Sequence, residues 1–184
     1  SSKANLMAEV RGWSRFVATQ FPYSLASRDP ERAIIPMARS EDIAMTVWGI
    51  LGGGVLTGKY RDESAVTRYD DASEERMQMG DALVEMANEI GATPSQIAIN
   101  WIRQRPGSGA PIIPILGARS LAQLEDNLAA LNFSLTGEQI TALEELSPIK
   151  LGFPYDFLTS SGVRSLVFGE TYDQIDNHRN FLWK

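Results

Sequence analysis

The segment PIIPILGARSLAQLEDNLAAL, residues 111–131, predicts a strand, a tight turn and a helix in succession. Its short apolar run is typical of a strand that is buried on both faces of a parallel sheet. Gly117 and Ala118 let the backbone turn, and Ser120 with Gln123 has the spacing of a capping box. Leucines then recur at helical spacing and predict one face turned to the core. These are Leu121, Leu124, Leu128 and Leu131.

Arg119 stands immediately before this predicted helix. A helix N-terminus presents free amides and the positive end of the helix dipole, so it attracts anions. The planar guanidinium of an arginine matches the geometry of a phosphate. Two interpretations are open: a phosphate-binding arginine, or a solvated arginine beside an ordinary strand-to-helix connection. The local pattern taken alone favours the second.

Strands and helices alternate on both sides of this segment. β-Branched and aromatic residues predict strands over residues 15–21 and 43–48. Periodic apolar residues predict helices over residues 3–13, 29–39, 74–90, 94–105 and 137–146. This alternation indicates a parallel α/β sheet, either doubly wound or a (β/α) barrel.

Several predicted helices have capping residues at their N-terminal ends. Asp29 is the predicted cap of a helix whose first position is Pro30. Thr93 with Gln96, and Thr136 with Gln139, have the spacing of further capping boxes. Residues 149–184 are rich in aromatic residues, glycine and serine, which predicts a long loop with at most one short helix.

The composition of the chain argues against several classes of protein and site. The chain has 184 residues, enough for one domain with a sizeable core, and its net charge of −6 argues against a nucleic-acid or anionic-membrane surface. There is no cysteine and a single histidine, so neither a thiolate site nor a transition-metal site is expected. The sequence has no apolar run of about 20 residues and no signal-peptide core at its start. We therefore expect a cytoplasmic protein.

Four segments together resemble the aldo-keto reductases, in particular the subgroup related to aryl-alcohol dehydrogenases and potassium-channel β subunits. They are FVATQFPYSLASRDPERAIIPMAR (16–39), VWGILGGGVLTGKYR (47–61), TPSQIAINWIRQRP (93–106) and IPILGARSLAQLEDNLAAL (113–131). The resemblance runs from Ser2 to about Pro148. It implies a partial (β/α)8 TIM barrel: about the last three βα units with the C-terminal helix in residues 1–148, and a docked tail in residues 149–184. The chain would then begin at the helix after the fifth strand.

The resemblance also implies an NADP(H) site at the carboxyl ends of the strands. Gln20 matches the residue that holds the nicotinamide carboxamide, and Trp48 the aromatic that stacks on the nicotinamide ring, a role that suits a large flat side chain. A loop matches the one that folds over the pyrophosphate, where successive glycines permit close backbone approach. Its matching residues are Gly49, Ile50, Leu51, Gly53 and Lys59.

The adenosine end of the cofactor has matching residues in the opening segment. The family residues that bind the 2′-phosphate and ribose are matched by Gly117, Arg119 and Gln123. The pair that contacts adenine and its ribose is matched by Asp126 and Asn127. This resemblance favours the phosphate-binding interpretation of Arg119. The sequence differs from the family pattern at two places that bear on its affinity for the cofactor. Gly49-Ile50-Leu51 replaces the usual Ser-Pro-Leu, and Asp126 is one methylene shorter than the usual glutamate.

Catalysis in the family uses an aspartate, a tyrosine, a lysine and a histidine from strands two to four and their loops. None of those motifs occurs in this sequence, and its one histidine, His178, has no matching context. We therefore assign no catalytic residue. Two functions stay open: the cofactor-binding half of an NADPH-dependent reductase of aldehydes or ketones, inactive by itself, or a non-catalytic half-barrel that assembles and senses NADP(H).

A sheet of three strands has two open edges, and open edges invite pairing with another chain. We expect the inward face of the strands to expose Val17, Met45, Val47 and Ile113. Exposed apolar patches normally mark an interface. The sequence therefore predicts self-association or binding to a complementary half-barrel.

Overall fold

The computed structural model describes residues 2–62, 72–105 and 110–175. The chain divides into two compact units, residues 1–148 and residues 149–184. The first unit holds a parallel sheet with its helices, and the second, as far as it is described (residues 149–175), holds short helices only. His178 and the last aromatic residues lie outside the described part of the chain.

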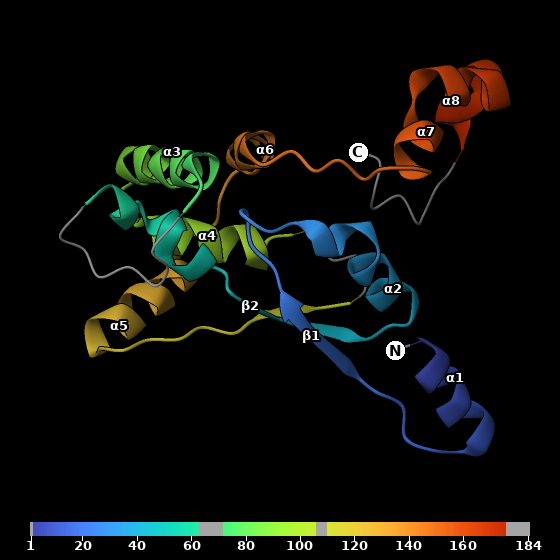
Figure 1. Ribbon diagram of the computed structural model, residues 1–184, viewed down its shortest axis with the longest axis horizontal. Helices are drawn as coiled ribbons and strands as arrows, with labels where there is room; N and C mark the ends of the chain where they lie inside the picture. Colours follow the sequence, from blue (N-terminus) through green and yellow to red (C-terminus); the bar gives the residue numbers. More distant parts are fainter. Residues whose placement is uncertain (1, 63–71, 106–109, 176–184) are drawn as a thin grey trace. The chain divides into compact units, whose positions relative to one another are not determined.

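In its described residues, the first unit is built on three parallel strands in the order β1 (Ala18–Pro22), β2 (Ala44–Trp48) and β3 (Ile112–Pro114) (Figure 1). In the register of this sheet, Gln20 pairs with Thr46, which pairs with Ile113. The amide of Ile115 donates to the carbonyl of Val47 at 2.7 Å and continues the pairing past the end of β3. The predicted parallel α/β architecture is confirmed.

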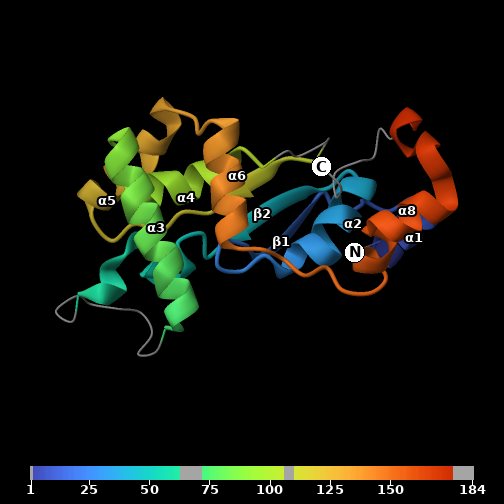
Figure 2. The ribbon, with the colours of Figure 1, turned by 90° about the horizontal axis from the view of Figure 1, so that it is seen from above.

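Six α-helices accompany these strands in the described part of the first unit. They are α1 (Ser2–Arg11), α2 (Ile34–Ser40), α3 (Glu74–Ile90), α4 (Pro94–Arg103), α5 (Leu121–Ala129) and α6 (Gly137–Leu146). In both views α3 to α6 gather at one end of the unit, whereas α1 and α2 lie at the other (Figures 1 and 2). The capping boxes of Thr93 and Thr136 form as predicted.

Two predicted helix starts differ from the structure. The carboxylate of Asp29 caps no helix: residues Asp29–Arg32 form a 3-10 turn, and Asp29 pairs with Arg32. Ser120 does cap α5, by accepting from the amide of Gln123 at 3.2 Å. The side chain of Gln123, however, accepts from the amide of Arg119 at 2.8 Å instead of closing the box on Ser120. The turn before α5 brings the amide of Arg119 closer to this side chain than the cap residue's own amide.

Helix α4 is the centre of the core. Every residue from Ile97 to Ile102 is buried. The helix contacts α3 on one side and α5 on another, and it also packs on β3 (Figure 1). Because a helix that is apolar all round must be covered all round, α4 fixes the positions of the elements around it.

The two faces of the sheet differ, and the predicted orientation of β2 is wrong. Met45 and Val47 are fully buried against the helices. The alternate residues Gln20, Trp48 and Ile113 are exposed on the opposite face. Because side chains alternate along a strand, burial of Met45 and Val47 under the helices turns Trp48 to the open side. The strands are therefore not buried on both faces, contrary to the prediction.

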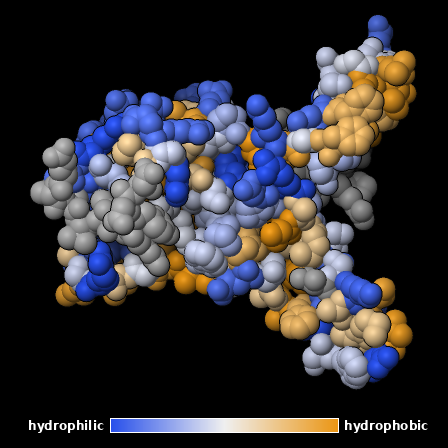
Figure 3. Space-filling model, in the orientation of Figure 1, coloured by the Kyte–Doolittle hydropathy of each residue, from blue (hydrophilic) through white to orange (hydrophobic). Residues whose placement is uncertain are grey.

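The leucine stripe of α5 is also exposed. Leu121 is 71% exposed and Leu128 51%, and Leu124 and Leu131 are exposed as well. Helical periodicity predicts which side chains share a face, but not whether another element covers that face. No described element of this unit covers the stripe. A second exposed apolar region lies around α1 and the approach to β1 (Figure 3), and it includes Leu6, Val10, Phe16 and Val17.

The second unit is more helical than predicted. It contains α7 (Tyr155–Thr159), α8 (Ser161–Phe168) and a 3-10 segment, Gly169–Gln174. Ser160 caps α8 by accepting from the amide of Val163 at 3.4 Å. The glycines and serines of the tail therefore start and end short helices instead of forming one continuous loop.

A buried ion cluster ties the segment after β1 to α4 and to the end of α6. Glu31 accepts from Arg28 at 2.7 and 2.9 Å and from the hydroxyl of Tyr23 at 2.7 Å. Arg105 pairs with the same carboxylate at 3.2 Å, and Arg28 also donates to the carbonyl of Ser147 at 2.8 Å. Both guanidiniums lie over the ring of the buried Trp101.

Charge and burial act in opposite directions on Glu31. Burial by itself raises the pKa of this carboxyl, but the hydrogen bonds from Arg28 and the charge of Arg105 outweigh burial and hold the pKa below its ordinary value. The ionised form therefore stabilises the folded chain at neutral pH. This contribution is complete above the ordinary pKa of 4.5 and is lost as the pH falls through the lowered value.

We expect Glu31→Gln to lower the free energy of unfolding by about 3–5 kcal/mol at about pH 7, because it leaves the buried Arg28 guanidinium without its anion and takes from Arg105 one of its two carboxylate partners, the other being Glu144. Urea unfolding measures the difference. The gap between the variant and the unaltered chain should narrow as the pH falls below about 4.5 and through the lowered pKa of Glu31, because the native carboxyl then becomes protonated. Asp29→Asn, which removes an exposed pair, is the control and should cost at most about 1 kcal/mol. Equal losses in the two variants would contradict the assigned role of Glu31.

Candidate functional site

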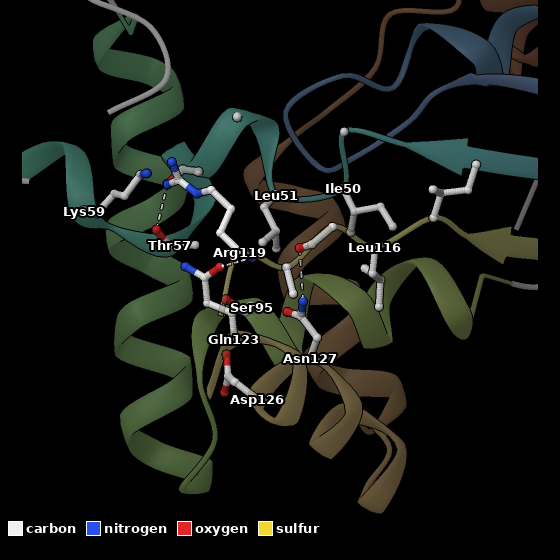
Figure 4. Close-up of a pocket in the computed structure, with 16 residues that line it drawn as sticks. Ile50, Leu51, Thr57, Lys59, Ser95, Leu116, Arg119, Gln123, Asp126 and Asn127 are labelled. Carbon is white, nitrogen blue, oxygen red and sulfur yellow. Dashed lines mark hydrogen bonds between the residues drawn. The ribbon is translucent and has the colours of Figure 1, made fainter. Parts of the chain in front are cut away.

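A cavity of about 580 Å³ opens at the carboxyl ends of β2 and β3 (Figure 4). Residues 49–59, which follow β2, form one wall, and residues 115–127, which follow β3, form another. Ser95 from the first turn of α4 completes the lining. The volume lies within the range of small-molecule and cofactor sites, and the position is the usual one for ligands in parallel α/β sheets.

The wall after β2 is a tight glycine-rich turn. Gly52, Gly53 and Gly54 all have positive φ angles, between 59° and 97°, which other residues rarely adopt. A Cβ atom on Gly54 would lie 2.5 Å from Cε of Lys59, so the lysine side chain lies directly across this glycine. The hydroxyl of Thr57 donates to the carbonyl of Gly54 at 2.7 Å and holds the turn closed.

Helix α3 holds this wall in place. A Cβ atom on Gly80 would lie 2.4 Å from the carbonyl oxygen of Val55, so the helix and the wall approach more closely than any other residue would permit. Arg61 pairs with Glu74 and with Asp81 of α3, each at 2.7 Å. Hydrogen bonds from Arg61 lower the pKa of Glu74, and the two carboxylates raise the pKa of Arg61.

The wall after β3 carries the main cation of the cavity. Arg119 precedes the cap of α5, and its side chain and that of Lys59 point toward the same end of the cavity (Figure 4). Within the described residues, no carboxylate pairs with the guanidinium of Arg119. Two cations at a helix N-terminus form a region that favours an anion with several oxygens, such as a phosphate.

Asp126 and Asn127 are held by neighbouring elements. One carboxylate oxygen of Asp126 accepts from the hydroxyl of Thr93 at 2.9 Å and from the side-chain amide of Gln96 at 2.8 Å. Asn127 is buried, and its side chain donates to the carbonyl of Gly117 at 3.5 Å. These bonds fasten α5 to the start of α4 and to the turn after β3.

Ten of the twelve residues singled out in the sequence line this one cavity. They are Gly49, Ile50, Leu51, Gly53, Lys59, Gly117, Arg119, Gln123, Asp126 and Asn127. Gln20 and Trp48 lie outside the lining, on the open face of the sheet. Trp48 is 48% exposed and directly precedes Gly49, the first lining residue after β2.

The sequence reasoning missed Thr57 and Ser95 as lining residues. Ser95 lies in a segment whose pattern shows only a helix cap, and only the packing of α4 beside α5 brings it to the cavity. Thr57 lies in the segment 47–61, which resembles the family's pyrophosphate loop, but nothing in that pattern indicates a role for the Thr57 hydroxyl. Six lining residues in all were not singled out. They are Gly54, Thr57, Ser95, Ile115, Leu116 and Ala118.

Two other kinds of site find no support in the part of the chain that the structure describes. Across residues 2–62, 72–105 and 110–175, no three histidine, aspartate or glutamate side chains gather in a way that suits a metal ion. None of the helices in the same ranges has both the length and the apolar character needed to cross a bilayer.

Parallel strands covered by helices, with a cavity at their carboxyl ends, define an α/β protein of the barrel or doubly wound class. The solved structure of the glycerol dehydrogenase AKR11B4 from Gluconobacter oxydans matches this arrangement with a TM-score of 0.62 and 23% identity. The match covers 80% of this chain and 49% of that protein. The fold is thus about half of a (β/α)8 barrel.

The chain belongs to the aldo/keto reductase family, whose family model matches residues 1–148. The norsolorinic acid reductase stcV of Emericella nidulans is 32% identical to it over 87% of this chain and 41% of that protein. The aryl-alcohol dehydrogenase [NADP(+)] of Phanerodontia chrysosporium is 32% identical over 94% of this chain and 44% of that protein. The chain therefore spans about half the length of these curated relatives.

Proposed function

We propose that this chain is the NADP(H)-binding, C-terminal half of an aldo-keto reductase that acts on aldehydes or ketones. The observation that carries the proposal is the placement of Arg119 and Lys59 in one cavity, at the start of α5 and beside a glycine turn. The name of the relative from Phanerodontia chrysosporium, which includes NADP(+), supports the same cofactor. The chemistry supplied by such a cofactor is hydride transfer.

The lining residues fit the parts of this cofactor. Arg119 and the free amides of the first turn of α5 suit the 2′-phosphate, because both offer donors to oxygens. The turn at Gly52–Gly54 suits a pyrophosphate, because the ammonium group of Lys59 lies against Gly54 and supplies a positive charge at the turn. Trp48 and Gln20, on the open face of the sheet, would hold the nicotinamide end.

We expect Arg119→Ala to weaken NADPH binding about ten- to a hundredfold and to leave NADH binding nearly unchanged. A charge-assisted hydrogen bond contributes about 1.5–3 kcal/mol, and NADH lacks the 2′-phosphate that would accept it. Isothermal titration calorimetry of each nucleotide measures the two affinities. The control is Arg11→Ala, an arginine that stacks on Trp13 and does not line the cavity. Equal loss for both nucleotides would remove Arg119 from this role.

We further expect the purified chain not to reduce carbonyl compounds by itself. Its sequence contains none of the family's catalytic motifs, and loss of general acid catalysis alone costs about 10²–10⁴ in rate. Oxidation of NADPH in the presence of aromatic aldehydes and ketones should therefore stay at background. Turnover that follows the protein through each purification step would show that one of its own residues supplies the proton.

A second function is favoured by the exposed apolar surface. The edge strands are β1 and β3, and exposed apolar residues occur at both: Phe16 and Val17 lead into β1, Ile113 belongs to β3, and the leucine stripe lies on α5, the helix that follows β3 in the chain. Such edges normally pair with another chain. We propose that the chain self-associates through these edges, as a half-barrel module that binds NADP(H) without catalysis.

Light scattering should then give a dimer or larger assembly of the 20.3 kDa chain, with stability that rises with protein concentration. Leu121→Glu combined with Leu128→Glu should shift the chain toward the monomer, because it places charges on an apolar contact. Ala122→Glu, which adds a charge at an exposed position on the other side of the same helix, is the control and should leave the assembly unchanged. A monomer whose unfolding does not depend on concentration would contradict self-association.

A further inference from the structure

We propose that Arg76 of α3 is a positioning residue for the glycine turn of the cavity, Gly52–Gly54, and that it fixes the direction of the peptide group between Gly52 and Gly53. This proposal rests on the proposed function of the cavity, in which the turn binds the pyrophosphate of the cofactor. The family resemblance matched residues after β2 only, and neither it nor the sequence motifs gave a role to Arg76. The guanidinium acts through the carbonyl of Gly52 on the amide of Gly53.

Arg76 contacts the turn through the carbonyl of its first glycine. The Nη2 atom of Arg76 donates to the carbonyl oxygen of Gly52 at 3.3 Å. A Cβ atom on Gly52 would lie 3.3 Å from the same nitrogen, so the guanidinium lies directly against this glycine. Gly52 is buried and, like Arg76, does not line the cavity, whereas Gly53 does. Arg76 therefore contacts the turn on the side away from the cavity.

The charge of Arg76 is not neutralised by any residue that the structure describes. Across residues 2–62, 72–105 and 110–175, no carboxylate pairs with Arg76, and its buried Nε atom has no hydrogen-bond acceptor. The carboxylate of Glu74, on the same helix, pairs with Arg61 instead. The guanidinium thus adds a positive charge behind the turn, and Lys59 supplies another across Gly54. Both charges favour an anion such as a pyrophosphate.

The contact with Arg76 determines where the amide of Gly53 points. A trans peptide is planar, and its carbonyl and its N–H point in opposite directions. Because the Gly52 carbonyl points to Arg76, the Gly53 N–H points away from α3, on the side where Gly53 lines the cavity. A cation bound to the carbonyl also polarises the peptide, which makes its N–H a stronger donor.

The amide of Gly53 is not used within the turn. The amide of Gly52 donates to the carbonyl of Gly49, and the amide of Gly54 donates to the carbonyl of Leu51, each at 2.8 Å. No described residue accepts a hydrogen bond from the amide of Gly53. This amide is therefore a donor that a ligand in the cavity can use.

Side chains also hold the other two glycine carbonyls of the turn. The hydroxyl of Tyr60 donates to the carbonyl of Gly53 at 3.3 Å, and that of Thr57 donates to the carbonyl of Gly54 at 2.7 Å. Of the three side chains that hold these carbonyls, Arg76 alone is charged and alone comes from α3. It therefore couples the direction of the turn to the position of that helix.

The test compares ligands with and without a pyrophosphate by calorimetric titration of the full chain. Arg76→Met keeps the length of the side chain and should weaken NADPH and NADH binding equally, by about 2- to 10-fold, the effect of one hydrogen bond. It should leave the binding of adenosine 2′-monophosphate unchanged, because this ligand has the 2′-phosphate but no pyrophosphate. Arg76→Lys, which keeps a charged donor, should restore most of the lost affinity.

Arg15→Met is the matched control, because it removes the same charge from an arginine that pairs with Glu41 and does not line the cavity. It should leave the affinities for all three ligands unchanged. A second measurement needs no variant: saturation of the unaltered chain with NADPH should shift the amide resonance of Gly53 in a proton–nitrogen NMR spectrum.

Three results would overturn the role of Arg76 and leave the proposed function standing. They are unchanged binding of NADPH and NADH by Arg76→Met, an equal loss for adenosine 2′-monophosphate, and a Gly53 amide resonance that does not move although NADPH binds. Absence of NADPH binding by the unaltered chain would overturn both the role of Arg76 and the proposed function.

Discussion

Complete burial of α4 is the constraint on which the rest of the first unit depends. Residues 97–102 are all buried, so α3, α5 and the sheet must pack around them. Asn100 is accommodated because its side chain donates to the carbonyl of Ala130 at 2.9 Å. This packing brings the wall after β2 and the wall after β3 to either side of one cavity.

Polar contacts then fix the positions of the helices relative to one another, which apolar packing alone does not determine. The Glu31 cluster joins the segment after β1 to the ends of α4 and α6 through charged groups. The Asp126 network does the same between α4 and α5. Buried charges and amides must be paired, so each network accepts essentially one arrangement of its helices. The cavity keeps its shape because both networks are satisfied.

The cavity and the exposed face of the sheet are both features of the half-barrel fold. In a complete barrel the inward face of each strand is filled by layers of side chains from the other strands. In this chain that face carries Gln20, Trp48 and Ile113, all exposed. The cavity, in contrast, is lined by the segments that follow β2 and β3 and by the starts of α4 and α5, all of which this chain supplies.

The sequence by itself determined the element order, the parallel sheet, the capping boxes at Thr93 and Thr136, and most of the cavity lining, because all of these depend on local periodicity and on motifs a few residues long. Only the tertiary structure decided which face of β2 is buried, that the leucines of α5 remain exposed, and that Ser95 reaches the cavity. A pattern of period two or 3.6 shows which side chains share a face. Whether another element lies against that face depends on contacts between residues far apart in the chain, and a single sequence does not contain them.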